Sequence, residues 1–218
     1  MTTELTLVRS KLQQAADSAC FTCSFQAEDV VLLHLLRQVD PKIPVLFLDT
    51  GYHIPALLRY RDQLVKSWGI NLVNLTSALS RGQQEARFGR LYRTDPEACC
   101  RMRKVDPLFK ALENYSVWFT GLRREQSPTR ANLMMVETAT LPSGHTLEKV
   151  SPLALWRWKE VWRYLVANDI PYAPLYDQGY TSIGCEPCTA RPPDPSNARS
   201  GRWGGTKLEC GIHTSHVG

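Results

Sequence analysis

A short apolar run, followed at once by a turn and a helix, is the feature that most constrains the fold of this chain. Residues 45–48 read Val-Leu-Phe-Leu, and Asp49-Thr50-Gly51 follows them. We predict a helix over roughly 55–68, bounded by Pro55 and Gly69, and a strand over 70–75. A strand that is apolar on both faces is typical of a parallel sheet covered by helices on both sides. The segment therefore predicts a βαβ unit.

The same alternation extends over most of the 218 residues. It predicts an α/β fold with a doubly wound, mostly parallel sheet, in one domain. Residues 171–218 contain six prolines and seven glycines, so we interpret 171–218 as an irregular tail of the same domain as residues 1–170. The other predicted elements are helices over 4–17, 30–39 and 156–168, and strands over 21–25, 117–120 and 133–136.

Three loops are candidates for a binding site, because ligands of open α/β sheets lie beyond the carboxyl ends of the strands. They are residues 24–29, 49–51 and 121–130. The chain shows neither a run of about 18 apolar residues nor a basic segment followed by an apolar one near Met1. We therefore expect no membrane segment, no secretory signal and a cytoplasmic location.

The seven cysteines form three pairs and one single residue. Clustered cysteines in a reducing compartment more often bind metal or carry chemistry than form disulfides. The adjacent pair Cys99-Cys100 and the C-x-x-C pair of Cys185 and Cys188 together supply four thiolates. Four thiolates suit a structural zinc ion or an iron–sulfur cluster, and ligand type alone does not decide between them.

The remaining cysteines have different expected roles. Cys20 and Cys23 are three positions apart in a predicted strand, so their side chains should point to opposite faces, and we predict that both are buried. Cys210 lies near the end of the tail, among glycines that would let the segment move as a lid. A cysteine there can act as a nucleophile if nearby cations lower its pKa. An ordinary free thiol is the alternative.

The excess positive charge is local. The formal net charge is +5, and residues 81–130 hold eleven Lys and Arg against six Asp and Glu. A basic patch beside Cys99 and Cys100 suggests an anionic ligand, although a solvated charged face would have the same composition.

Several motifs, taken in order, resemble the assimilatory adenosine 5′-phosphosulfate (APS) reductases, within the wider family of APS and 3′-phosphoadenosine 5′-phosphosulfate (PAPS) reductases. The resemblance spans most of the chain. It rests on Ser24-Phe25-Gln26-Ala27-Glu28-Asp29, Leu48-Asp49-Thr50-Gly51, Cys99-Cys100-Arg101-Met102-Arg103-Lys104, Thr120-Gly121-Leu122-Arg123-Arg124-Glu125-Gln126-Ser127, Gly184-Cys185-Glu186-Pro187-Cys188 and Glu209-Cys210-Gly211-Ile212-His213.

The resemblance implies an adenine nucleotide alpha-hydrolase-like fold and a [4Fe–4S] cluster on Cys99, Cys100, Cys185 and Cys188. It implies that Cys210 attacks APS, that sulfite and AMP are the products, and that thioredoxin supplies the electrons. The PAPS-specific branch generally lacks the cluster cysteines, so their presence points to APS.

The resemblance also implies a set of substrate contacts. Cations would hold the phosphosulfate, while strand ends and the helix after Ser24 would meet the nucleoside. Lys104, four residues after Cys100, could link the cluster to the substrate. Arg103 and Arg123 are further candidates for contact with the phosphosulfate, and a solvated surface position is the alternative for both. The predicted contacts are Ser24, Asp29, Leu48, Lys104, Gly121, Arg130, Arg199, Arg202 and His213.

Three other functions remain open from the sequence. PAPS reduction differs only by one phosphate on the substrate. ATP-dependent adenylation uses the same architecture, but the 24–29 loop has no glycine for pyrophosphate. An iron–sulfur or zinc redox sensor would leave Cys210 without a role. We expect no nucleic-acid or membrane partner, and a homo-oligomer is compatible with the sequence.

Overall fold

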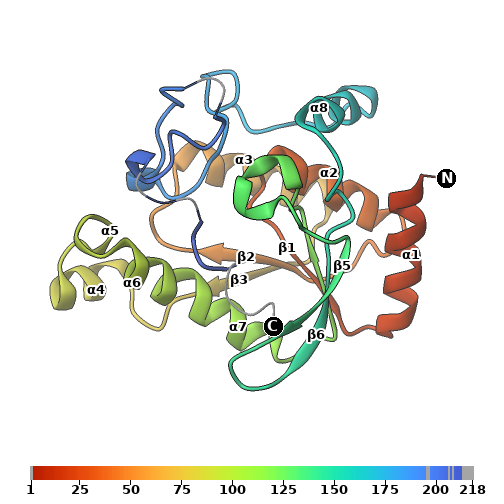
Figure 1. The fold of residues 1–218 in the computed structure, drawn as a ribbon, viewed down its shortest axis with the longest axis horizontal. Coiled ribbons are helices and arrows are strands. Elements are labelled where there is room, and N and C mark those ends of the chain that lie inside the picture. Colours follow the sequence, from red (N-terminus) through yellow and green to blue (C-terminus); the bar gives the residue numbers. More distant parts are fainter. Residues whose placement is uncertain (1, 195–196, 206, 208, 213–218) are drawn as a thin grey trace.

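Six strands form one sheet in the order β3-β2-β1-β4-β6-β5 (Figure 1). The computed structural model describes residues 2–194, 197–205, 207 and 209–212. All neighbouring strands pair in parallel except β5, which is antiparallel to β6. The prediction of a doubly wound, mostly parallel sheet is confirmed. The strands are β1 (Ala19–Thr22), β2 (Val45–Asp49), β3 (Leu72–Thr76), β4 (Val117–Thr120), β5 (Val136–Thr140) and β6 (Thr146–Val150).

Helices cover both faces of this sheet. Besides the α-helices, a π-helical turn (Arg101–Val105) joins α6 to α7, and 3-10 turns occur at Arg124–Gln126, Pro128–Arg130, Glu186–Cys188 and Trp203–Gly205. The α-helices are α1 (Thr3–Ala15), α2 (Ala27–Arg37), α3 (Pro55–Trp68), α4 (Arg81–Phe88), α5 (Leu91–Thr94), α6 (Pro96–Cys100), α7 (Asp106–Leu112) and α8 (Trp158–Ala167).

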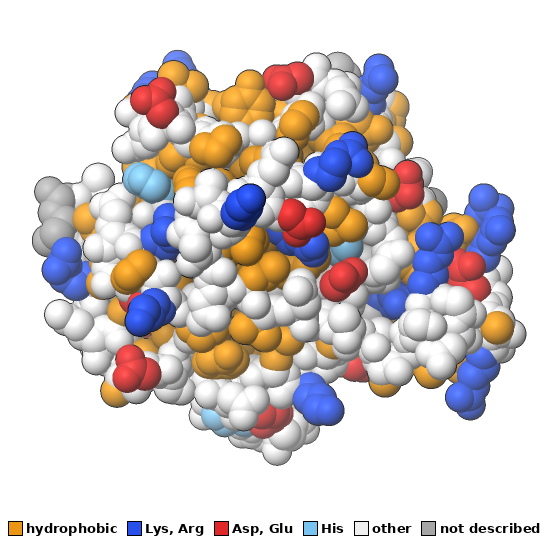
Figure 2. Space-filling model, turned by 180° about the vertical axis from the view of Figure 1, so that it is seen from behind, with side chains coloured by type: hydrophobic (Ala, Val, Ile, Leu, Met, Phe, Trp, Pro, Cys, Tyr) orange, Lys and Arg blue, Asp and Glu red, His pale blue; other side chains and the backbone are white. Residues whose placement is uncertain are grey.

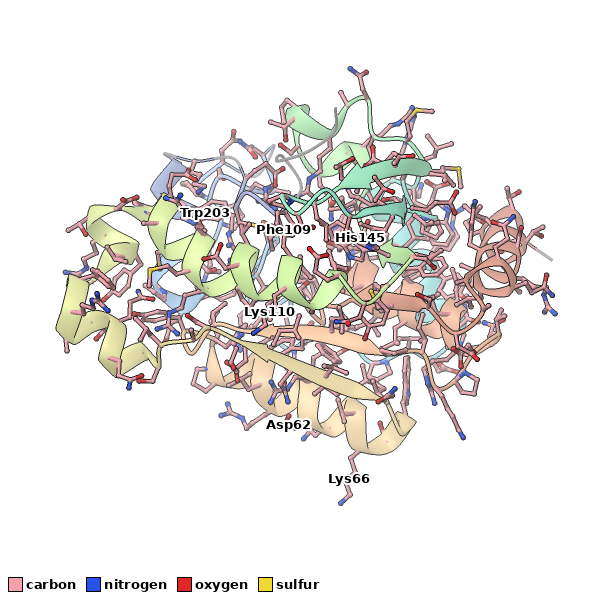
Figure 3. The ribbon with its side chains drawn as sticks, turned by 90° about the horizontal axis from the view of Figure 1, so that it is seen from below. Asp62, Lys66, Phe109, Lys110, His145 and Trp203 are labelled. Carbon is pink, nitrogen blue, oxygen red and sulfur yellow. The ribbon has the colours of Figure 1, made fainter. Side chains whose placement is uncertain are left out.

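Alternate residues of each strand enter two separate cores. Phe119 packs with α1, α2, α3 and α8, whereas its neighbour Trp118 packs with α7 on the other face. Cys23 and Cys20 divide in the same way and are both buried, as predicted. In Figure 3, α7 lies across one side of the sheet, and Lys66 of α3 projects away from the other. Burial on both faces explains why the central strands β1, β2 and β4 are largely apolar.

The strand order reverses between β1 and β4, which lie side by side in parallel. One half of the sheet continues from β1 through β2 and β3, and the other from β4 through β6. Such a reversal opens a crevice beyond the carboxyl ends of the two central strands. Thr22 and Thr120 are paired at that end, so the loops that begin at Cys23 and Gly121 lie at the crevice.

The sequence prediction was wrong at the β5 edge of the sheet. The strand predicted over 133–136 begins only at Val136, and β6 was not predicted. The pattern of β6 is obscured by Lys149, which is buried because its Nζ lies 2.6 Å from Oε1 of Glu137 on β5. A buried lysine is tolerated only with such a partner, and the partner comes from another strand.

The tail crosses the crevice end of the sheet. It contacts the sheet loops through an isolated bridge between His53 and Cys185, and it folds on itself through another between Thr189 and Arg202. In Figure 1 the blue segment lies beyond the ends of β1 and β2. Near its end, Ile212 packs with the α7 core. In the part of the chain that the structure describes, no helix is both long and apolar enough to cross a membrane.

Candidate active site

A cavity of about 740 Å³ occupies the crevice beyond β1, β2 and β4. Its volume lies in the range typical of small-molecule sites. The sheet loops form one side, and the tail, including Cys210, forms the other. The predicted contacts among its lining residues are Ser24, Asp29, Leu48, Lys104, Gly121, Arg130, Arg199 and Arg202. The remaining predicted contact, His213, lies outside the described residues.

The turn between β1 and α2 is organised around the buried carboxylate of Asp29. Its Oδ2 accepts hydrogen bonds from the amide of Ser24 at 2.6 Å and from Oγ of Ser24 at 2.5 Å. Burial, followed by the charge of Glu28, raises the pKa of Asp29 to about 7, against the opposing effects of Ser24 and Arg130. Asp29 therefore fixes the turn that borders the cavity.

Gly121 lets the loop after β4 approach this turn closely. A Cβ built on Gly121 would lie 2.0 Å from Oδ1 of Asp29 and 3.2 Å from its Cα. Only glycine leaves room for both backbones here. On the β2 side, the carbonyl oxygen of Leu48 lies 2.9 Å from Nε2 of His53. These three strand ends form a continuous wall.

The four paired cysteines line one small cavity next to the large one. Cys99 and Cys100 come from α6, and Cys185 and Cys188 flank a 3-10 turn of the tail. Burial raises the pKa of Cys100 to about 11 and also raises those of Cys99 and Cys188. Among the described residues, no three or more His, Cys, Asp or Glu side chains lie close enough together to hold a metal ion as they stand. The set of four thiols is nevertheless the donor set that zinc or an iron–sulfur cluster requires.

Lys104 borders both cavities. It lies in the π-helical turn after Cys100, so the segment is helical but wider than the α-helical turn that the sequence suggested. Burial would lower the pKa of Lys104, but the nearby side chains of Cys185, Cys210 and Cys100, when ionised, raise it above its usual value. The ammonium group thus interacts both with the paired cysteines and with Cys210.

Two residues behind the cysteine cavity were not recognised from the sequence. Gln84 is fully buried, and its Nε2 lies 3.9 Å from Sγ of Cys99. Its Oε1 accepts a 2.7 Å hydrogen bond from Nε of Arg103, whose Nη1 donates to the carbonyl of Thr50. The alternative of a solvated surface position does not hold for Arg103, because it is 3% exposed. A glutamine in an exposed helix carries no local signal of such a role.

Arg123 is also buried, so the alternative of a surface position does not hold for it either. Its Nη1 donates to Glu125 at 3.0 Å, and its guanidinium group lies over the ring of Trp158. The neighbouring Gln126 accepts from the amide of Arg123 and donates to Glu28. These contacts hold the 121–130 loop against α2.

Arg202 reaches the cavity through a gap at Gly184. A Cβ on Gly184 would lie 2.1 Å from Nη1 and Nη2 of Arg202. Nη1 donates to Oγ1 of Thr189 at 3.1 Å, and the side chain is almost fully buried. The tail thus folds around a guanidinium group that borders both the cavity and the C-x-x-C turn.

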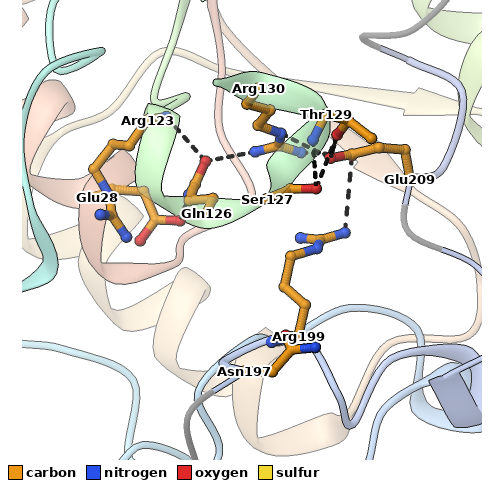
Figure 4. Close-up of polar contacts among 9 residues, drawn as sticks. All are labelled: Glu28, Arg123, Gln126, Ser127, Thr129, Arg130, Asn197, Arg199 and Glu209. Atoms are coloured by element: carbon orange, nitrogen blue, oxygen red, sulfur yellow. Dashed lines mark hydrogen bonds and ion pairs between the residues drawn. The ribbon is translucent and has the colours of Figure 1, made fainter. Parts of the chain in front are cut away.

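Arg130 and Arg199 converge on Glu209, next to Cys210 (Figure 4). Arg130 forms a bidentate pair with this carboxylate, at 2.9 Å from Nε to Oε1 and 2.6 Å from Nη2 to Oε2. Nη2 of Arg199 lies 3.8 Å from Oε2. Glu209 was not among the predicted site residues, because the partners that give it a role lie about 80 and 10 positions away.

The basic segment does not form one wall of the site. Three of its eleven cations, Lys104, Arg123 and Arg130, line the cavity. Figure 2 shows Lys and Arg side chains gathered at the end of the molecule that carries α4 to α6. The exposed members of the segment are Arg81, Arg87, Arg90, Arg93, Arg101, Lys110 and Arg124. Much of the excess charge is therefore a solvated face, and the tail supplies two of the cations at the cavity.

Fold and site together define a doubly wound α/β protein whose crevice suits an anionic ligand of nucleotide size. The model of the phosphoadenosine phosphosulfate reductase domain matches residues 18–191, and the chain belongs to this family.

Curated relatives support the same assignment. The chain is 44% identical to adenosine 5'-phosphosulfate reductase of Rhodococcus erythropolis over 86% of this chain and 76% of the relative. It is 42% identical to the enzyme of that name from Geobacillus kaustophilus, over 92% and 86%. The fold resembles that of phosphoadenylyl-sulfate (PAPS) reductase from Candida auris, with a TM-score of 0.68, 23% identity and coverage of 82% and 88%.

Proposed function

We propose that this protein reduces adenosine 5′-phosphosulfate to sulfite and AMP, with Cys210 as the nucleophile. The observation that carries the proposal is the placement of Cys210 in the same nucleotide-sized cavity as Lys104, Arg130, Arg199 and Arg202. The family and the names of the relatives supply the reaction class.

The first step is nucleophilic attack on sulfur. The thiolate of Cys210 attacks the sulfonate sulfur, an S–S bond forms, and the bond from sulfur to the phosphate oxygen breaks. AMP leaves with that electron pair, and Cys210 becomes an S-sulfocysteine. Charge builds on the leaving phosphate, so the cations around the cavity would stabilise the transition state.

The second step needs an external dithiol, which we assign to thioredoxin. One thiolate of the dithiol attacks Sγ of Cys210, and sulfite leaves. The second thiol of the partner then attacks the mixed disulfide, which restores the Cys210 thiolate and leaves the partner oxidised. The two electrons that reduce the sulfonate to sulfite therefore come from the partner.

The small cavity would hold a [4Fe–4S] cluster on Cys99, Cys100, Cys185 and Cys188. These residues provide four sulfur donors that line one cavity, next to Lys104 and Arg202. The bound cluster would supply fixed charge and a structural link between α6 and the tail. APS is favoured over PAPS because the resemblance places these four cysteines with APS-specific enzymes.

The decisive experiment is incubation with APS in the absence of thioredoxin, followed by peptide mass mapping. We expect one sulfonate adduct, on Cys210, which disappears when reduced thioredoxin is added. The Cys210→Ser variant should carry no adduct and turn over at least about a thousandfold more slowly. An adduct elsewhere, or normal turnover by this variant, would refute the mechanism. Replacing APS by PAPS in the same assay tests the choice of substrate.

A further inference from the structure

The carboxylate of Glu209 is held by two of the cations that line the large cavity, Arg130 and Arg199. It accepts two hydrogen bonds from Arg130 and one, at 3.0 Å, from Oγ1 of Thr129, while Arg199 approaches the same group (Figure 4). Arginine that binds through two parallel N–H bonds is the usual receptor for carboxylate, sulfate and phosphate groups alike. The contacts that Glu209 makes are thus those an oxyanion of the substrate would seek.

This carboxylate is charged and shielded from water. Glu209 is 8% exposed. Burial alone would raise the pKa of Glu209, but the hydrogen bond and charge of Arg130, with the charge of Arg199, lower it below the usual range. Arg130 and Arg199 both line the large cavity. A second anion that reached these guanidinium groups would meet the negative charge of Glu209 at close range, which is unfavourable.

We propose that Glu209 is an internal anion that occupies the anion-binding subsite of the empty enzyme and exchanges with the substrate's phosphosulfate at Arg130 and Arg199. This inference rests on the proposed function for the identity of the substrate. The subsite itself takes a sulfate- or phosphate-like group.

The exchange has a consequence for Cys210, because the two residues are adjacent in the chain. While Glu209 is held by Arg130, the backbone of the tail is tied to the 126–130 loop and Cys210 is half-buried. When an anion takes over the arginines, that tie is lost, and Cys210 gains freedom to move within the cavity while Ile212 stays packed with the α7 core. Glu209 is thus a positioning residue that couples occupation of the anion subsite to the mobility of the Cys210 thiol.

Affinity for a simple anion tests the exchange directly. Glu209→Gln keeps the size of the side chain but removes its charge, so inorganic sulfate and AMP should bind about tenfold more tightly by calorimetry. Glu209→Asp keeps the charge and should stay close to the wild type in affinity. Glu137→Gln, which breaks the buried pair with Lys149 outside the site, is the matched control and should leave both affinities unchanged.

The rate of alkylation of Cys210 by iodoacetamide gives a second readout. Trypsin cleavage after Lys207 leaves a peptide in which Cys210 is the single cysteine, so its modification can be measured by mass. We expect about tenfold faster alkylation in Glu209→Gln, and faster alkylation of the wild type with sulfate than with chloride at equal ionic strength. Glu137→Gln should alkylate like the wild type.

A purely structural role for Glu209 predicts the opposite affinities. If Glu209 merely orients Arg130 and Arg199 for the ligand, Glu209→Gln will bind sulfate and AMP more weakly, and the proposal is overturned. Unchanged affinity and unchanged alkylation overturn it as well. Failure of APS turnover in the wild type, with the sulfate results as expected, would refute the proposed function and leave the anion exchange standing.

Discussion

The two sides of the large cavity are built by different means. The sheet wall, formed by residues 24–29, 48–50 and 121, continues directly from parallel strands and is fixed by backbone pairing and by the buried Asp29. The tail wall, formed by residues 183–185, 197–203 and 209–212, is held largely by side chains, including Gln26 to the amide of Ile183 and Arg130 to Glu209.

This difference implies that the sheet wall is rigid and that the tail wall can move. Strand ends in a covered sheet are among the most stable parts of a fold, whereas a segment tied by a few polar contacts can open at low cost. The nucleoside is expected to meet the sheet wall. Cys210, the proposed nucleophile, and two of the cations lie on the tail wall, where we propose that an arriving anion replaces Glu209 at the arginines.

Two glycines, one in each wall, offer the sharpest test of this contrast. In the sheet wall, Gly121→Ala would press its Cβ against both the side chain and the backbone of Asp29. The strand ends cannot separate, so we expect the free energy of unfolding to fall by about 1–3 kcal/mol. Urea denaturation measures this loss. Unchanged stability would show that the sheet wall is not rigid.

In the tail wall, the atoms nearest to a Cβ added by Gly184→Ala all belong to the far end of the Arg202 side chain. The guanidinium group can move aside, so we expect a loss of less than about 1 kcal/mol in stability. AMP should bind about tenfold more weakly, because a charged contact is displaced. Calorimetry with AMP and urea denaturation of the same sample separate the two effects. A large loss of stability with unchanged AMP affinity would show that the tail wall is rigid and that Arg202 does not contact the ligand.

The protonation of Asp29 should make the stability of the sheet wall depend on pH. Its pKa is raised to about 7 in the folded protein, whereas an unfolded carboxyl titrates near about 3.9. The folded state thus holds the proton longer, and its contribution to stability is lost as pH rises through that interval, by at most about 1.4 kcal/mol per pH unit.

Urea denaturation at several pH values between about 5 and 8 measures this slope. Asp29→Asn, which cannot ionise, should have a flatter profile over the same range. Identical profiles for the two proteins would show that Asp29 does not titrate there.

The smallest effect is expected at the exposed cations of α4 and the segment after it. Arg87→Ala combined with Arg90→Ala removes two solvated charges, which salt screens over about 8 Å. The affinity for AMP should change by less than about twofold. Arg130→Ala, which removes a charge inside the cavity, serves as the contrasting variant, with an expected loss of about tenfold or more. Equal losses of AMP affinity in the two variants would show that the exposed cations of the basic segment also contribute to the site.

Local patterns were sufficient for much of the fold. The apolar run 45–48, Pro55 and Gly69 predicted β2 and α3 because burial on both faces and helix boundaries leave marks in neighbouring residues. The strand β6 was missed because Lys149 depends on Glu137 from another strand. Gln84 was missed for the same reason, since its partners Cys99 and Arg103 identify it only once the helices are packed.

The sequence by itself determined the fold class, the loops that reach the crevice, and the residue types of the candidate site, because these depend on short-range periodicity and on which side chains are present. The tertiary structure alone decided which cations face the cavity and that Glu209 pairs with Arg130 and Arg199. It also decided that Lys104 lies between the four paired cysteines and Cys210. Charge and reactivity depend on distances of a few ångströms between residues far apart in the chain, and such distances exist only after folding.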